Sequence, residues 1–179
     1  MSFSQLEILY LPTIYFDMAV HKLEFDDFEE IDYFLLAIHT HLEDYRLAYF
    51  INQALHINLS KSAEEVAIRK NNLDLLFEKF DYFDENSDWI WTLIQNKCIT
   101  TAYKKQENFN LFDNEIVEET NTNYLLPELK TVSYFLRIND EINLDGIEKI
   151  VAKLSAVERI AMVYQIDKNK VKNKNNLIF

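Results

Sequence analysis

The hydrophobic pattern changes period twice along the chain, and each change predicts a strand followed by a helix. Residues 33–38 form an apolar run of strand length, and residues 42–56 repeat their hydrophobic positions every three to four residues. Thr40 and Glu43 have the spacing of a helix capping box, so we expect this helix to begin there. A short strand over residues 57–59 completes this first unit.

A turn of 100° per residue divides the first predicted helix into two faces. The core face carries Leu47, Ala48, Phe50, Ile51, Ala54 and Leu55. The opposite face carries Tyr45, Arg46, Tyr49, Asn52, Gln53 and His56. Tyrosine and arginine give a large contact area and forked hydrogen-bond donors, which favours a binding surface. The alternative is that a second layer of the same domain covers this face.

The second unit follows the same order. Residues 132–138 alternate as a strand, Asn143 can cap a helix, and residues 159–166 alternate as a further strand. The helix carries an apolar stripe made of Leu144, Ile147, Ile150, Val151 and Leu154.

Between the two units the pattern predicts mainly strands. Residues 61–72 read as a polar connector, and residues 73–83 and 88–94 as an aromatic-rich hairpin. Residues 99–103 can add another strand, and residues 104–120 have the composition of a mobile acidic loop. We therefore expect an α+β fold: an antiparallel or mixed sheet with two helices on one face, close to a ferredoxin-like plan with an inserted hairpin.

The ends of the chain differ from the rest. Residues 1–17 contain no lysine or arginine and are interrupted by acidic residues and a proline, so they lack the pattern of an export signal. We expect them to be an upstream extension, with Met18 starting a single domain over residues 18–179; a real edge strand is the alternative. The Lys/Asn-rich tail over residues 167–179 ends in three apolar residues, which we expect to dock on this subunit or on a neighbour.

Composition narrows the functional classes. The formal charge of −12 repels phosphate backbones, so nucleic acid is an unfavoured partner. A single glycine, Gly146, excludes the glycine-rich loops that cradle phosphates, and a single cysteine, Cys98, agrees with a cytoplasmic location. The acidic residues between 24 and 32 lack the spacing of a calcium loop and indicate a solvated face.

Residues 124–138 read as strand, turn and strand, with Pro127 ending the first apolar run. This stretch resembles the signature of the IPExxxVDY family of the Bacteroidota. Pro127, Glu128, Val132 and Tyr134 match the motif, whereas Leu126 replaces Ile and Ser133 replaces Asp. The likeness covers roughly residues 18–179. It implies a housekeeping role, because genes of this family often lie near those for ribonuclease III and pyruvate kinase, but it implies no biochemical activity.

The residues best suited to bind a metal are His39, His41 and Glu43, which lie between the end of a predicted strand and the start of a predicted helix. They superficially resemble the HxHxDH run of the metallo-β-lactamase fold, but the further ligands of such sites are missing. Glu128, near Asp140 and Glu141, could form a carboxylate pair for acid–base catalysis. A glutamate after a turn proline more often accepts backbone hydrogen bonds.

The sequence therefore favours a non-catalytic, cytoplasmic protein-interaction domain that needs no cofactor. We expect it to bind a protein partner or a second copy of itself, and no membrane. The expected binding residues are Tyr45, Arg46, Tyr49, Pro127, Glu128, Tyr134 and Phe179. The alternative is a small metal-dependent or acid–base enzyme centred on His39, His41 and Glu43.

Overall fold

The computed structural model describes residues 33–70, 73–84, 87, 89–105 and 116–179. All elements discussed below belong to one compact unit, Ile31–Phe179. The expectations for an extension over residues 1–17, a start at Met18 and an acidic face between residues 24 and 32 lie outside the described residues.

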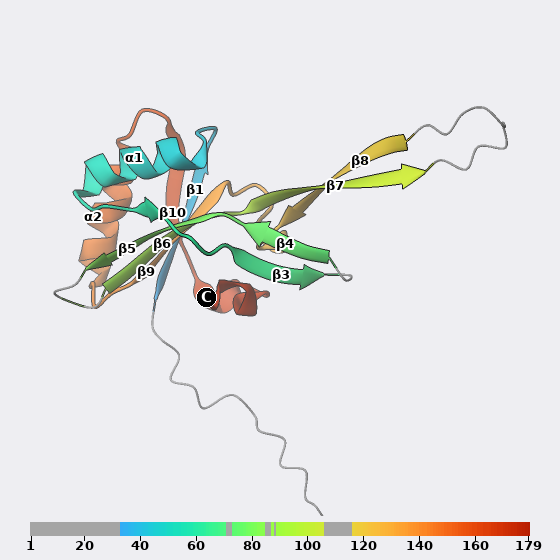
Figure 1. The fold of residues 1–179 in the computed structure, drawn as a ribbon. Coiled ribbons are helices and arrows are strands. Elements are labelled where there is room, and N and C mark those ends of the chain that lie inside the picture. Colours follow the sequence, from blue (N-terminus) through green and yellow to red (C-terminus); the bar gives the residue numbers. More distant parts are fainter. Residues whose placement is uncertain (1–32, 71–72, 85–86, 88, 106–115) are drawn as a thin grey trace, which may run out of the picture. The chain divides into compact units, whose positions relative to one another are not determined.

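The central feature is a six-stranded sheet in which every neighbouring pair is antiparallel (Figure 1). Its strand order is β10-β1-β9-β6-β5-β2. The strands are β1 (Phe34–Thr40), β2 (Ser60–Lys61), β5 (Lys79–Asp84), β6 (Trp89–Gln95), β9 (Tyr134–Asn139) and β10 (Ile160–Ile166). The adjacent interior strands β1 and β9 come from the two predicted strand–helix–strand units.

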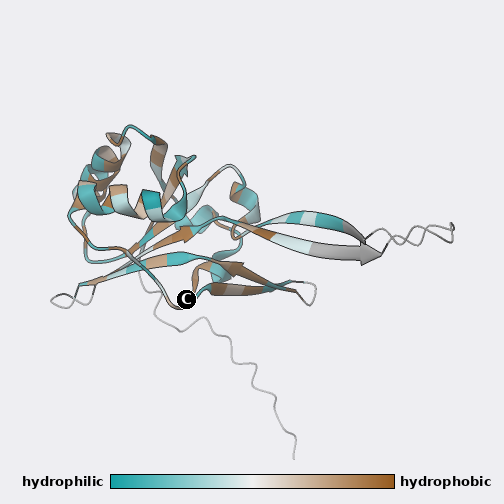
Figure 2. Ribbon diagram, turned by 45° about the horizontal axis from the view of Figure 1, so that its top comes forward, coloured by the Kyte–Doolittle hydropathy of each residue, from teal (hydrophilic) through white to brown (hydrophobic). Residues whose placement is uncertain are grey.

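Two helices, α1 (Asp44–Leu55) and α2 (Leu144–Ser155), cover one face of this sheet (Figure 1). Leu47 and Ile51 of α1 and Ile147 and Leu154 of α2 pack with Leu136 and other residues of the sheet in one buried cluster. Figure 2 shows hydrophobic positions on the sheet strands and mixed positions along the helices. The prediction of an α+β fold with two helices on one face is confirmed.

A second buried cluster lies on the opposite face of the sheet. Leu35 and Ala37 of β1 and Phe135 of β9 contribute to it, together with Phe77 from a separate hairpin and Leu177 from the C-terminal segment. The hairpin consists of β3 (Val66–Lys70) and β4 (Leu73–Phe77), and a second hairpin consists of β7 (Lys97–Lys105) and β8 (Ile116–Tyr124). Short 3₁₀ turns form η2 (Pro127–Leu129), η3 (Lys168–Lys170) and η4 (Lys174–Leu177).

The structure corrects three predictions about the middle of the chain. The polar connector over residues 61–72 contains β3, and the strand over residues 73–83 is divided at Glu78 into β4 and β5. The acidic loop over residues 104–120 is also wrong at both ends, because β7 continues to Lys105 and β8 begins at Ile116. All three predictions failed for the same reason. These segments become strands because a partner strand supplies their hydrogen bonds, and the spacing of hydrophobic residues within a segment does not reveal that partner.

The start of α1 also differs from prediction. Thr40 does not cap the helix: its hydroxyl donates to the carbonyl oxygen of Arg159 at 2.8 Å and accepts from the Leu42 amide. Glu43 occupies the N-cap position without a side-chain cap bond. In α2 the predicted cap is confirmed, since Asn143 Oδ1 accepts from the Gly146 amide at 2.8 Å, but Leu144 of the predicted apolar stripe is 63% exposed.

Asn96, which joins β6 to β7, is fully buried and holds the loop between β8 and β9. Its side-chain amide donates to the carbonyls of Leu129 and Val132, both at 2.9 Å, and its Oδ1 accepts from the Leu126 amide at 3.0 Å. Its own backbone bonds to Ser133 and Leu125. One polar side chain thus satisfies three backbone groups of a loop that has no ladder of its own.

We expect Asn96→Ala to lower the free energy of unfolding by about 3–5 kcal/mol, because it removes three hydrogen bonds and takes from the Leu126 amide and the Val132 carbonyl their Asn96 partner, whereas the Leu129 carbonyl keeps the Val132 amide. Urea denaturation measures this loss. Asn58→Ala, at an exposed position, is the matched control and should change stability by less than about 0.5 kcal/mol. Equal losses in the two variants would contradict the role assigned to Asn96.

Candidate functional site

The face of α1 that points away from the core is open. Tyr45 is 60% exposed and Tyr49 is 57% exposed, and Arg46 between them is also exposed. Tyr49 accepts a hydrogen bond from Gln53 Nε2 at 2.8 Å, which orients its hydroxyl along the helix. No second layer formed by the described residues covers these three side chains. The prediction that they lie together on the non-core face is confirmed, although Asn52, predicted on the same face, instead binds the backbone of Leu59.

An open depression of about 410 Å³ lies beside this face. It is lined by His41, Leu42, Glu43, Arg46 and Arg159. Arg159 comes from the turn after α2, and the hydrogen bond between its carbonyl and Thr40 holds that turn against the end of β1. Sequence reasoning missed Arg159, because no local pattern connects it with a helix more than a hundred residues earlier.

The depression combines two arginines with the carboxylate of Glu43. Neither Arg46 nor Arg159 forms an ion pair with a described acidic residue. Glu43, which lines the same depression, is instead hydrogen-bonded to Tyr45, and this bond raises the pKa of the Tyr45 hydroxyl. The depression therefore presents guanidinium donors to solvent, beside two exposed aromatic rings.

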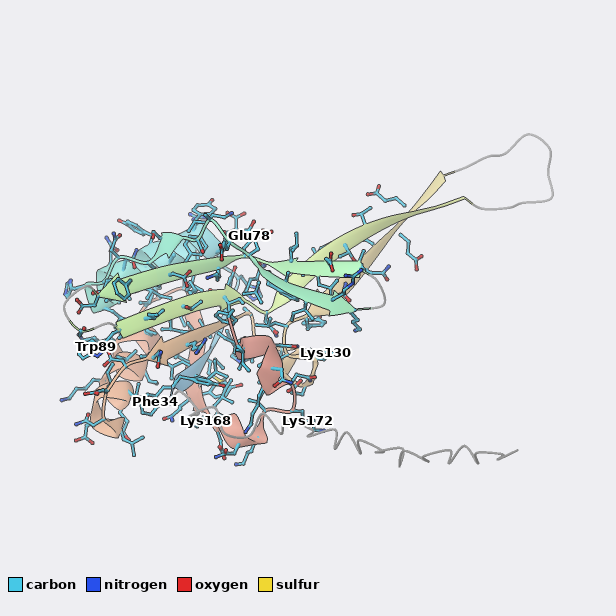
Figure 3. The ribbon with its side chains drawn as sticks, turned by 60° about the horizontal axis from the view of Figure 1, so that its bottom comes forward. Phe34, Glu78, Trp89, Lys130, Lys168 and Lys172 are labelled. Atoms are coloured by element: carbon cyan, nitrogen blue, oxygen red, sulfur yellow. The ribbon has the colours of Figure 1, made fainter. Side chains whose placement is uncertain are left out.

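A carboxyl pair that the sequence did not predict lies at the start of α1. A hydrogen bond with the Asp44 carboxyl raises the pKa of Glu78, although Lys61 lies 3.1 Å away and opposes the shift. Figure 3 labels Glu78 at the junction of β4 and β5. The Asp44 carboxyl also accepts a hydrogen bond from the Tyr45 amide at 2.7 Å, so the two carboxyls lie beside the first turn of α1.

Tyr134 belongs to the support of this surface and is not part of it. Its ring is buried, and its hydroxyl donates to the carbonyl oxygen of Leu42 at 3.0 Å. Burial, with a smaller contribution from Asp44, raises the pKa of Tyr134 to about 12. The preceding residue, Ser133, bonds both the amide and the carbonyl of Thr40. These contacts fix the turn that leads from β1 into α1.

Glu128 joins two distant parts of the chain. One of its carboxylate oxygens accepts from the amides of Lys172 and Asn173 at 2.8 and 3.0 Å, and the other accepts from Asn173 Nδ2 at 2.7 Å. Figure 3 labels Lys130 and Lys172, which mark the two segments. Burial alone would raise the pKa of Glu128, but the hydrogen bonds from Asn173, its own backbone and Lys172 outweigh it, and the pKa is lowered.

Of the two remaining predicted binding residues, Pro127 is exposed and Phe179 contacts another residue of the same chain. Pro127 is exposed and starts η2, where its fixed φ suits the first position of a turn. Phe179 lies over Arg137, with its ring centre 5.3 Å from the guanidinium carbon, and Arg137 also donates to the carbonyl of Leu177. Leu177 is buried, so this part of the tail docks on its own subunit.

The candidate metal ligands are not brought together. His39 stacks on Tyr164, with ring centres 5.7 Å apart, and it does not line the depression that contains His41 and Glu43. Across the described residues, no group of three His, Cys, Asp or Glu side chains is placed to hold a metal ion. The arrangement on α1 is suited to contact with another molecule through aromatic rings and guanidinium groups.

Comparison with family models, curated proteins and solved structures gives no match to this chain. The resemblance to the IPExxxVDY family therefore stays a prediction. Among the described residues, no helix has the length and apolar character needed to cross a bilayer.

We expect Glu128→Ala to release residues 172–173 and to speed hydrogen exchange at the Lys172 and Asn173 amides, which lose their acceptor. Because the folded pKa of Glu128 is lowered, its contribution is present above the ordinary carboxyl pKa and is lost as pH falls through the folded value. Exchange measured by NMR at neutral pH tests this. Glu148→Ala, on the exposed side of α2, should leave both amides protected.

The Tyr134 hydroxyl predicts a pH effect at the alkaline end. Its folded pKa lies above the ordinary value of 10.0, so its stabilising contribution is complete below pH 10 and is lost as pH rises to about 12. Tyr134→Phe should cost about 1 kcal/mol at pH 7 and progressively less across that window. Urea denaturation at several pH values tests this, with Tyr49→Phe as an exposed control. A difference that stays constant with pH would contradict the prediction.

Proposed function

We propose that this chain is a non-catalytic protein-interaction domain that binds its partner through the exposed face of α1. The observation that carries the proposal is the grouping of Tyr45, Arg46 and Tyr49 on a helix whose other face is fully used by the core. Exposed tyrosines beside an arginine have the composition of binding hot spots, and they are held on a rigid element.

The chemistry of the surface indicates which groups the partner presents. Arg46 and Arg159 line one depression, and a carboxylate of the partner fits their forked donors. The rings of Tyr45 and Tyr49 suit an apolar side chain next to that carboxylate. The net charge of −12 disfavours a nucleic acid in this position, so we propose a protein partner in the cytoplasm and a housekeeping role, as the family resemblance implies.

Two finer proposals concern fold and family. β1, α1 and β6 form one strand–helix–strand unit, with β6 in place of the strand predicted over residues 57–59, and β9, α2 and β10 form the other. Their interleaved order β10-β1-β9-β6 supports a ferredoxin-like plan extended by β5, β2 and two hairpins. Membership of the IPExxxVDY family is supported by the internal use of its signature, since Leu126 and Val132 are buried and Glu128 and Tyr134 are hydrogen-bonded within the chain. The enzyme alternative gains no support from the positions of His39, His41 and Glu43.

The test is the triple variant Tyr45→Ala, Arg46→Ala, Tyr49→Ala. The tagged protein is purified from its native host under gentle conditions, and the co-purifying proteins are quantified against wild type. We expect a stoichiometric partner of the wild-type chain to be reduced at least about tenfold, because truncation of several hot-spot residues typically costs more than 1.4 kcal/mol. Isothermal titration with the recovered partner then measures the affinity of each single variant.

The matched control is Phe83→Ala, which removes an exposed aromatic ring from β5. It should retain the partner. Both variants should keep the wild-type melting temperature within a few degrees. A triple variant that unfolds would show that these side chains stabilise the fold, and a folded triple variant with unchanged partner binding would refute the proposed surface.

A further inference from the structure

The outer strand of the main sheet, β10, has an unprotected edge. Within the described part of the chain it pairs with β1 alone, so the backbone groups on its other side have no strand partner. Its seven residues, Ile160 to Ile166, include no charged residue and no proline. Natural proteins usually protect such an edge with charges, prolines or very short strands, since an open edge pairs with other chains.

The other strands at open edges are protected. The opposite edge of the sheet is β2, which has only two residues, one of them Lys61. Each strand of the two separate hairpins contains at least one charged residue. The lack of protection is therefore specific to β10 among the described strands.

The sequence around β10 is self-complementary in the antiparallel direction. When two copies run antiparallel with Val163 opposite Val163, Arg159 lies opposite Asp167 of the second copy, so opposite charges meet at both ends. Between the ends, Met162 lies opposite Tyr164, Ala161 opposite Gln165, and Ile160 opposite Ile166.

We propose that two copies of this chain associate through β10, in the antiparallel register centred on Val163, to form one continuous twelve-stranded sheet. Arg159 forms no ion pair with described residues. Asp167 is paired with the exposed Lys170 of its own chain at 3.6 Å, but about half of its side chain stays exposed, so a second copy can reach it. Met162, 55% exposed, meets Tyr164, 37% exposed, in a sulfur–aromatic contact.

The charges select this register. A shift of the two-fold centre by one residue, to Met162, places Arg159 opposite Gln165 and removes both ion pairs. A centre at Tyr164 places Asp167 opposite Ala161, with the same result. Only the register centred on Val163 pairs Arg159 with Asp167, and it does so twice because the arrangement is two-fold symmetric.

The test compares wild type with two single charge-reversal variants and their double variant, and sedimentation equilibrium measures the dimerisation of each. The full chain is measured over a range of concentrations at about 0.15 M salt, where the Debye length is about 8 Å and the repulsion between two acidic copies is screened. We expect wild type to dimerise. Arg159→Asp and Asp167→Arg should each weaken the dimer by about tenfold or more, since like charges then face each other at both ends. The double variant Arg159→Asp/Asp167→Arg should restore it.

The double variant is the decisive control. Within its own chain Asp167 accepts a hydrogen bond from the Asn169 amide at 3.0 Å and pairs with Lys170 at 3.6 Å, and its substitution removes both contacts in the Asp167→Arg and double variants alike. Only re-formed pairing between copies explains a recovered dimer. A monomeric wild type at all concentrations, or a double variant no better than the single variants, would overturn the proposal. A monomer whose β10 amides are protected from exchange would overturn it as well, because another part of the same chain would then cover the edge.

The triple variant separates this experiment from partner binding by α1, although Arg159 lines the depression beside that helix. The triple variant of Tyr45, Arg46 and Tyr49 leaves β10 unchanged and should dimerise like wild type. Its failure to bind a partner and a failure of the β10 dimer are therefore separate results.

Discussion

The buried side chain of Asn96 is the interaction on which much of this structure depends. The loop between β8 and β9 has no strand pairing of its own, and the backbone groups that Asn96 binds in it are buried or partly buried. An unpaired buried amide or carbonyl costs roughly 1–3 kcal/mol, so the loop keeps one conformation because a single carboxamide satisfies three of them. The hydrophobic side chains of Leu126 and Val132 can then enter the core.

Three other parts of the molecule are fixed through this loop. Ser133 bonds the last residue of β1, Tyr134 bonds the turn that leads into α1, and Glu128 holds residues 172–173 of the C-terminal segment. The signature stretch thus connects the first helix, the central strands and the tail. The side chains of this stretch thus serve contacts within the chain, whereas Tyr45, Arg46 and Tyr49 of α1 stay exposed.

The parts that could be predicted from sequence are those determined by local period. Most of the two faces of α1, the cap of α2, the part of its apolar stripe from Ile147 to Leu154, and the presence of strand β10 follow from spacing within a dozen residues. Predictions failed where a distant segment decided the outcome. Thr40 has the spacing of a helix cap, yet its hydroxyl bonds the carbonyl of Arg159, and β3 escaped notice because its partner β4 defines it. For the same reason Arg159 could not be assigned to the depression beside α1 before the fold was known.

Arg159 connects the two proposed surfaces. Arg159 lines the depression beside α1. In the proposed dimer it is also the residue that meets Asp167 of the second copy at the end of β10. One guanidinium cannot donate fully to two carboxylates in different places. A carboxylate of a partner bound at α1 and Asp167 of the second copy therefore compete for the guanidinium of Arg159. By linkage, a partner that weakens the dimer is itself bound less tightly by the dimer, and by the same factor. Because Arg46 and the two tyrosines take no part in the β10 contact, this coupling is limited to one side chain, and the two interactions oppose each other without excluding each other.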